Sequence, residues 1–218
     1  QSPMRLSSYL ARLIWLSLLP LILFVGWLVY ASVAAIQEKS DSEAQQIARN
    51  FAIAIDHNLE ARIDALILLS RTVHTGDESQ WPALYRHAQE FHRTFHGHIV
   101  LAEGATDGPM RMRLNTRVPF GTMLPVLPKP DGRAAAPLAL STRRPAVGDT
   151  FFGPIAREPL VAMAVPLLDG ANVRQVMLAT FETRLYQGRI EKVSIPAGWR
   201  LSLLDSRGDV IARLPGNA

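Results

Sequence analysis

The chain of 218 residues contains no cysteine, which excludes a disulfide scaffold, a thiolate zinc site and a cysteine nucleophile. Lysine is scarce, since 20 of the 23 basic residues are arginine. The formal net charge is +4 and there is no basic run, so we expect no nucleic-acid partner. Charged residues make up 19% and hydrophobic residues 48% of the chain, a balance that argues against a disordered protein.

Catalytic and cofactor-binding motifs are missing as well. The sequence has no G-x-S-x-G, H-E-x-x-H, G-x-x-x-x-G-K-[ST] or G-x-G-x-x-G pattern. His92 and His96 have the spacing of a helical zinc pair, but no Asp, Glu or Cys is placed by spacing to complete the site. We interpret the two histidines as part of a solvated helical face. The chain is therefore expected to be no enzyme and to hold no metal or cofactor.

One long segment lacks charge, between Arg12 and Glu38. A helix needs about 20 apolar residues to cross a bilayer, so this segment predicts a transmembrane helix over 13–35. The basic residues that precede it predict a cytoplasmic N-terminus over 1–12 and a location on the opposite side of the membrane for the rest. A cleaved signal peptide is the alternative, although its apolar region would be shorter, about 7–15 residues.

The next segment, 36–76, has the pattern of a long amphipathic helix. Neither proline nor glycine occurs before Gly76, and apolar residues recur at steps of mostly three and four, at Ile47, Phe51, Ile55, Leu59, Ile63, Leu66 and Val73. We expect this helix to continue directly from the membrane helix. A helix of this length cannot bury its apolar stripe alone. We therefore expect it to pack on its own domain, on a second copy of the chain in a homodimer, or on both.

The segment from residue 77 to residue 213 has patterns of both helices and strands. A helix is expected from the capping residues at 77–79 to Gly97, followed by strands and one helix at 98–103, 110–116, 160–168, 173–182, 183–192, 199–205 and 209–213. Turn residues join the strands at 107–108, 169–172 and 206–208, and an irregular loop rich in Pro, Gly and Ala is expected over 119–148. This order predicts an α+β domain that has one antiparallel sheet with helices on one face.

Arginines are concentrated in the strand-and-loop region, and their planar forks suit carboxylates and phosphates. A pocket lined by some of them would favour a small anionic ligand, although most could equally be surface charges. The candidate ligand-binding residues are Arg113, Asn115, Arg117, Asp149 and Arg157. Asp149 could instead cap a loop, and Asn115 and Arg117 could be structural.

Three blocks of sequence carry a family resemblance. They are His98–Leu101 with the string LNTRVPFG at 114–121, VGDTFFGP at 147–154 with PLVAMAVP at 159–166, and Gly198–Asp205 with GDVIAR at 208–213. Together they resemble the extracytoplasmic Cache (PAS-like, double-Cache type) sensor region of bacterial transmembrane receptors. The nearest similarity is to sensor histidine kinases and diguanylate cyclases.

This resemblance implies a division into a membrane helix, a signalling and dimerisation helix, a sensor domain over 77–197, and a hairpin over 198–218 that would open a second lobe. It also implies a place in the inner membrane of a bacterium, with the sensor domain in the periplasm. The expected function is signal sensing in a two-component system, with a small ligand bound between the sheet and the loop 119–153. Trp81 and Tyr85 do not reproduce the amino-acid-binding signature of some Cache domains. The alternatives are a membrane-tethered interaction module without a small ligand, and the input domain of a diguanylate cyclase or a chemoreceptor.

Overall fold

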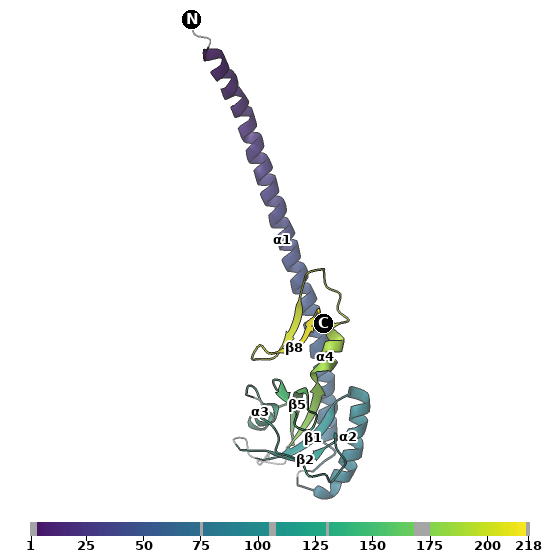
Figure 1. The fold of residues 1–218 in the computed structure, drawn as a ribbon. Helices are drawn as coiled ribbons and strands as arrows, with labels where there is room; N and C mark the ends of the chain where they lie inside the picture. The colour runs from purple at the N-terminus through teal and green to yellow at the C-terminus, as the bar shows by residue number, and fades with distance from the viewer. Residues whose placement is uncertain (1–3, 75, 105–107, 130, 168–174, 217–218) are drawn as a thin grey trace. The chain divides into compact units, whose positions relative to one another are not determined.

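The structure is a computed structural model that describes residues 4–74, 76–104, 108–129, 131–167 and 175–216 (Figure 1). Residue 107 of the turn predicted at 107–108, the whole turn predicted at 169–172, and residues 168, 173 and 174 of the flanking predicted strands lie outside the described residues. The chain divides into two compact units, 1–50 and 51–218.

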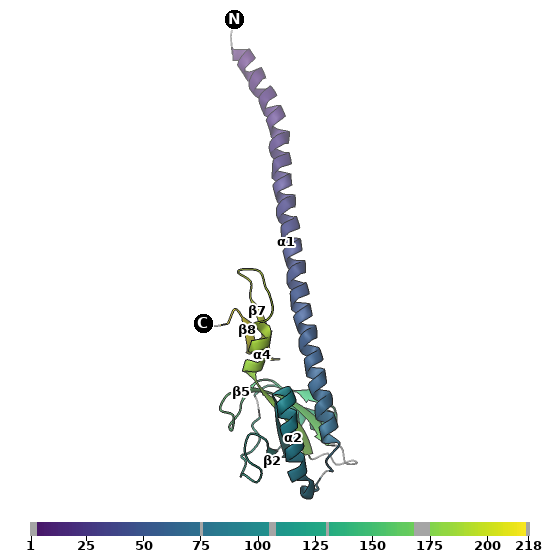
Figure 2. The ribbon, with the colours of Figure 1, turned by 90° about the vertical axis from the view of Figure 1, so that its right-hand side faces the viewer.

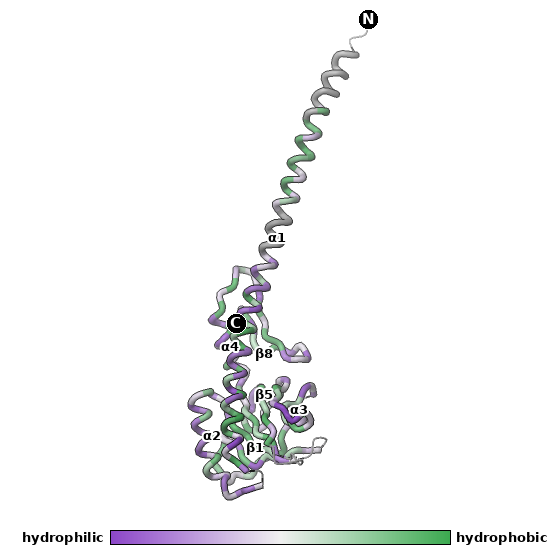
Figure 3. The backbone as a smooth tube through the Cα atoms, turned by 180° about the vertical axis from the view of Figure 1, so that it is seen from behind, coloured by the Kyte–Doolittle hydropathy of each residue, from purple (hydrophilic) through white to green (hydrophobic). Residues whose placement is uncertain are grey.

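Helix α1 runs without interruption from Met4 to Ser70, which confirms the predicted continuity of the N-terminal helix with the amphipathic one. In the first unit, the large apolar side chains described between Trp15 and Tyr30 are exposed, and they give the green stretch of α1 in Figure 3. Within the described part of the chain, no helix reaches the length and apolarity needed to cross a membrane. The span predicted over 13–35 is therefore not confirmed by the structure.

The C-terminal end of α1 lies at Ser70 and not at Gly76 as predicted. The hydroxyl of Ser70 donates to the carbonyl of Ile67 at 2.7 Å, and that of Thr72 donates to the carbonyl of Leu69 at 2.7 Å. Hydroxyl groups that bond the last carbonyls of a helix take the place of further turns. Gly76 stands later in the connection to α2, with a positive φ of 82°.

The main sheet has six antiparallel strands in the order β2-β1-β6-β5-β3, with β4 paired to β5. The strands are β1 (His98–Glu103), β2 (Arg111–Asn115), β3 (Ala146–Val147), β4 (Phe151–Phe152), β5 (Pro159–Leu167) and β6 (Gln175–Glu182). The central strands β5 and β6 are apolar along nearly their whole length and almost completely buried. Such strands need cover on both faces of the sheet.

Helices cover both faces, so the predicted arrangement with helices on one face is wrong. The C-terminal part of α1 and the helix α2 (Trp81–Phe95) pack on one face, and α3 (Ala135–Thr142) packs on the other (Figures 1 and 2). The loop expected over 119–148 therefore contains a helix and the short strand β3. Helix α3 has no capping side chain, a proline within its span and no polar face, so its sequence carries no helical periodicity.

A β-bulge interrupts the regular alternation of faces along β2, the strand predicted at 110–116. Leu101 pairs with Leu114 and Ala102 pairs with Met112, which leaves Arg113 as the extra residue. Leu114 consequently packs in the core under α2, whereas Met112 packs in the core under α3. In a regular strand the two residues, which are two positions apart, would lie on one face.

Arg62 attaches the C-terminal part of α1 to the main sheet and to α2. Its side chain is 2% exposed, its guanidinium lies 4.2 Å from the centre of the Phe181 ring, and it donates to the carbonyl of Phe95 at 3.4 Å. Burial lowers the pKa of this guanidinium. The contacts join α1 to α2 and to β6.

The chain ends in a helix and a hairpin close to their predicted positions, α4 (Thr183–Ile190), β7 (Leu201–Leu204) and β8 (Val210–Leu214). The hairpin packs on α4, where the side chain of Gln187 exchanges two hydrogen bonds with the backbone of Arg213. The turn of the hairpin is tied to the main sheet, because Asp205 accepts from the hydroxyl of Thr150 at 2.7 Å.

Candidate functional site

A cavity of about 330 Å³ lies between the sheet and the segment that leads into α3. This volume falls at the lower end of the range for small-molecule sites. Ala162 of β5 and Leu178 of β6 contribute from the sheet, and the other lining residues are Gly108–Met110, Val126–Lys129, Ala134–Pro137, Gly148, Asp149 and Phe151. The cavity lies in the region that the sequence predicts, between the sheet and the loop 119–153.

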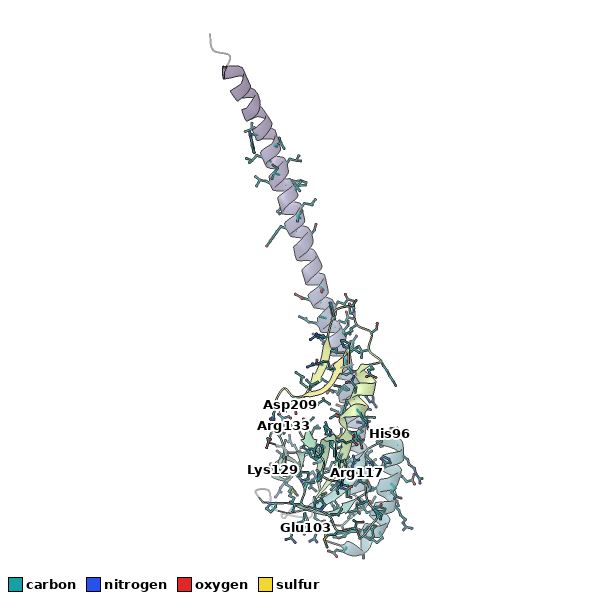
Figure 4. All side chains as sticks on the ribbon, in the orientation of Figure 1. His96, Glu103, Arg117, Lys129, Arg133 and Asp209 are labelled. Atoms are coloured by element: carbon teal, nitrogen blue, oxygen red, sulfur yellow. The ribbon has the colours of Figure 1, made fainter. Side chains whose placement is uncertain are left out.

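Small side chains create this space. Ala135 and Ala136 at the start of α3 face the sheet opposite Ala162 and are each less than 6% exposed. Of the described lining residues, Lys129 and Asp149 are charged, and Lys129 is exposed to solvent (labelled in Figure 4). The cavity thus offers an apolar body with a cationic group at its edge. Alanine carries no chemical signal, so sequence reasoning missed these lining residues.

Asp149 is 3% exposed and its hydrogen bonds are internal. Its carboxylate accepts from the backbone N–H of Arg133 at 2.6 Å and from the N–H and hydroxyl of Ser206 at 2.9 and 2.7 Å. Burial alone would raise the pKa of Asp149, but these hydrogen bonds lower it below its ordinary value. The arrangement fits the loop-capping alternative better than recognition of an amine.

Asn115 and Arg117 line a second, much smaller hollow of about 20 Å³, which shares Leu127, Pro128 and Phe151 with the cavity. The Asn115 Oδ1 atom accepts from the backbone N–H of Arg117 at 2.9 Å and holds the turn after β2. Arg117 Nη1 lies 2.7 Å from Glu182 Oε1, and both side chains are about nine-tenths buried. The structure therefore brings Asn115, Arg117 and Asp149 to neighbouring hollows.

The two other predicted residues lie elsewhere on the surface. Arg113, the bulge residue, pairs with Glu103 at 3.0 Å and is 41% exposed. Arg157 is exposed and has a positive φ of 58° in the turn before β5. Neither belongs to the lining of the cavity or of the smaller hollow.

A third, open hollow of about 510 Å³ lies at the other side of Arg117. It is lined by His92, His96, His98, Arg117, Glu182, Arg184 and Leu185 (His96 and Arg117 are labelled in Figure 4). The rings of His92 and His98 lie in contact, with their centroids 4.0 Å apart and their planes inclined by 31°. Among the described residues, no group of three His, Asp or Glu side chains could hold a metal ion.

His98 makes the stability of this domain dependent on pH. Burial, together with the charges of Arg117 and His92, lowers its pKa from 6.5 to about 4. The unfolded chain therefore binds a proton more readily, so stability is unaffected above pH 6.5 and falls as the pH decreases from 6.5 to 4. Because the ring is partly exposed, we expect a loss of roughly 1–2 kcal/mol.

The measurement is a series of urea unfolding curves between pH 7.5 and pH 4 for the wild type and His98→Gln. The variant should lose the part of the pH dependence that lies between 6.5 and 4. Identical slopes for the two proteins in that range would show that His98 is protonated equally easily in the folded and unfolded states.

No protein-family description and no curated protein matches the chain. Solved structures do match its fold. The ligand-binding domain of the amino acid chemoreceptor PctC of Pseudomonas aeruginosa PAO1, in complex with GABA, is 20% identical, with 78% of this chain and 74% of that chain covered and a TM-score of 0.52.

Two further structures are similar. The ligand-binding domain of the Pseudomonas fluorescens chemoreceptor CtaA with L-isoleucine is 14% identical, with 82% and 70% of the two chains covered and a TM-score of 0.56. That of a Campylobacter jejuni chemoreceptor with L-valine is 9% identical, with 78% and 69% covered and a TM-score of 0.56. At these identities the likeness concerns the fold. The chain has the fold of the ligand-binding domains of bacterial chemoreceptors, the Cache (PAS-like) sensor fold that the sequence resemblance predicts.

Proposed function

We propose that this chain is the extracytoplasmic, ligand-sensing input region of a bacterial membrane receptor, and that its ligand binds in the cavity between the sheet and α3. The observation that carries the proposal is the 330 Å³ cavity itself, which is lined from two sides by a buried sheet and a helix. A pocket that is mostly apolar and has few polar groups is typical of small-molecule sites. The fold, shared with domains crystallised with small ligands, supports the same function.

The lining favours a small ligand with an apolar body and an anionic group. The apolar part would contact Met110, Ala162 and Leu178, and the anionic group would reach Lys129. The similar chemoreceptor domains bind GABA, L-valine and L-isoleucine. Here the carboxylate of Asp149 already accepts three hydrogen bonds from Arg133 and Ser206, which leaves it little capacity to hold an amino group. We therefore propose a carboxylate without an amine rather than an amino acid.

The sequence-based site is revised accordingly. Asp149 remains as a wall of the cavity and as the residue that fixes its loop, and Asn115 and Arg117 support the neighbouring smaller hollow. Arg113 and Arg157 are left out of the proposed site because they lie exposed on the surface.

A cavity-filling substitution tests the proposal. In Ala162→Leu the larger side chain should occupy the space that the ligand needs. We expect a ligand at a hundredfold excess over its Kd to stabilise the wild type by about 2.7 kcal/mol and the variant not at all. The measurement is a thermal-unfolding screen of the full chain, kept in mild detergent, against small carboxylates, phosphates, amino acids and amines.

The control is Ala52→Leu, the same substitution at an exposed position of α1, which should respond to the ligand like the wild type. Ligand stabilisation that survives in Ala162→Leu would place the binding site elsewhere. A wild type that unfolds cooperatively and responds to none of the compounds would argue against a small-molecule sensor.

Signalling is proposed to run through α1. In this proposal, residues 13–35 anchor the chain in the membrane with residues 1–12 in the cytoplasm, and residues 36–70 pair with a second copy. A ligand would favour one packing of the paired helices, and the available energy is its difference in affinity for the two states, typically about 1–3 kcal/mol. We propose a histidine kinase output, with a diguanylate cyclase or a chemoreceptor as alternatives, and a second lobe that begins at residues 198–218.

A specific observation favours a second candidate, a protein-interaction module. The loop after β2 exposes three apolar side chains, with Phe120 46%, Met123 95% and Val126 52% exposed. Apolar side chains gathered on an exposed loop mark surfaces that bind other proteins. A partner that binds this loop and is lost in Met123→Ser, in a chain that binds no small molecule, would favour this candidate.

A further inference from the structure

The open hollow at the end of α2, lined by His92, His96, His98, Arg117 and Arg184, is separate from the proposed ligand cavity. Four elements supply its residues. His92 lies in the last turn of α2, His96 is the residue that caps its C-terminal end, and His98 begins β1. Glu182 and Arg184 lie where β6 ends and α4 begins. Since Arg117 follows β2, the hollow collects basic and imidazole groups that are far apart in the sequence.

Its single carboxylate is already neutralised. Glu182 accepts from Arg117 at 2.7 Å. Burial alone would raise the pKa of Glu182, but its hydrogen bonds and the nearby charges of Arg117 and His98 together lower it. The remaining cation, Arg184, has a weak contact of 3.6 Å with Glu158 and is 74% exposed, so it can move toward a ligand. The hollow therefore has a surplus of positive charge at neutral pH, and protonation of its histidines increases this surplus.

Donor groups next to the hollow lack acceptors. The Nε and Nη2 atoms of Arg117 are buried and have no hydrogen-bond partner, and the same holds for Nδ1 of His92. Nε–H and Nη2–H form one edge of the planar guanidinium, the edge that can hold two oxygens of a carboxylate, sulfate or phosphate. Buried polar groups without partners are uncommon in folded proteins and call for an explanation.

We propose that this hollow is a binding site for a small free oxyanion, held by Arg117 and Arg184 and by the protonated form of His98. The oxyanion would supply the acceptors that Arg117 and His92 lack, at a position bordered by α2, β1, β6 and α4. His98 is the group whose protonation the anion would favour most. It faces His92 and His96 from α2, Arg117 and the hydroxyl of Thr116 from the end of β2, and Glu182 from β6. The negative charge of a bound anion would stabilise the protonated ring of His98, which burial and the charges of Arg117 and His92 otherwise disfavour.

The test is a histidine NMR titration of the full chain with sodium sulfate as the probe and sodium chloride at equal ionic strength as the reference. Sulfate keeps its two charges over the whole range of the titration. We expect 20 mM sulfate to raise the pKa of His98 by about one unit, which corresponds to tenfold tighter binding to the protonated form. The signal of His98 is assigned with His98→Gln, and the exposed His87 serves as the internal reference.

A charge-removing variant completes the experiment. Arg184→Gln removes a largely exposed cation and should leave the fold intact, but the effect of sulfate on His98 should fall several-fold. Arg117→Ala is not used in this experiment, because it would leave the buried Glu182 carboxylate unpaired and destabilise the fold. An unchanged pKa of His98 in sulfate, an equal shift of His87, or an effect of the same size in Arg184→Gln would each overturn the proposal.

Discussion

Replacing Arg117 by alanine is expected to lower the free energy of unfolding by about 3–5 kcal/mol at pH 7, because removal of one member of a buried ion pair leaves the other charge unpaired. Arg117 Nη1 and Glu182 Oε1 are 2.7 Å apart, and the two side chains are only 11% and 10% exposed. In the variant, Glu182 would keep its charge in a site that the arginine no longer compensates.

The loss should depend on pH in a definite direction. In the wild type the pKa of Glu182 is lowered from 4.5, so the pair stabilises the fold above that value and its contribution is lost as the pH falls below it. In Arg117→Ala the pKa of Glu182 should be higher than in the wild type, since the hydrogen bond and the charge of Arg117 no longer oppose burial. Glu182 can take up a proton, and the difference between variant and wild type should shrink at acid pH.

Urea unfolding at pH 7 and pH 4 measures both effects. The double variant Arg117→Met/Glu182→Met is the control, because it replaces the ion pair with apolar side chains and leaves no charge unpaired. It should be more stable at pH 7 than Arg117→Ala. A single variant that loses less than about 1 kcal/mol at pH 7 would mean that the pair behaves like an exposed one.

A methyl group at Gly97 is expected to have an effect of similar size. The Cβ of an alanine at this position would overlap the ring of Phe181 and would lie 2.6 Å from its Cζ atom. Phe181 cannot yield easily, since it is completely buried between Phe91, at a ring distance of 6.4 Å, and the guanidinium of Arg62. We expect Gly97→Ala to destabilise the domain by about 3 kcal/mol, at the upper end of the range for overpacked cores.

The matched control is Gly188→Ala in α4. No atom lies within 4 Å of the Cβ it would add, and alanine is the better helix former, so a gain of roughly 0.5–1 kcal/mol is expected. Combining Gly97→Ala with Phe181→Leu should recover part of the loss, because the smaller side chain makes room. Thermal unfolding of the four proteins checks both statements. Equal stability of Gly97→Ala and the wild type would show that the Phe181 ring can move aside.

The sequence predicted secondary structure best where the local pattern of residues was compatible with only one type of element. The strand at His98–Glu103 has the predicted bounds, and α2 and α4 begin at or close to their predicted first residues. Local signals failed where tertiary contacts decide. The α3 segment has no periodicity because it is covered by the sheet, and Arg113 lies in a bulge that no single residue announces.

The candidate site shows the same division. The loop that closes the cavity could be located from its composition, whereas the alanines that make the space could not. The role of Asp149 depends on Ser206, which is 57 residues away in the sequence, and that of Arg117 depends on Glu182 on another strand. Side chains of one chemical type predict a possible partner, but only the fold decides which partner they meet.

A ligand in the cavity and the C-terminal hairpin can both form hydrogen bonds with the carboxylate of Asp149. It is a wall of the cavity, and it also holds the hairpin turn through two hydrogen bonds from Ser206. A ligand that donated to Asp149 in place of Ser206 would weaken the attachment of the hairpin turn, so ligand binding and hairpin attachment would each make the other less favourable. A ligand that leaves the carboxylate alone would be accommodated without disturbing the hairpin. Whether a ligand presents a hydrogen-bond donor to Asp149 would thus decide whether its binding alters the attachment of the C-terminal hairpin.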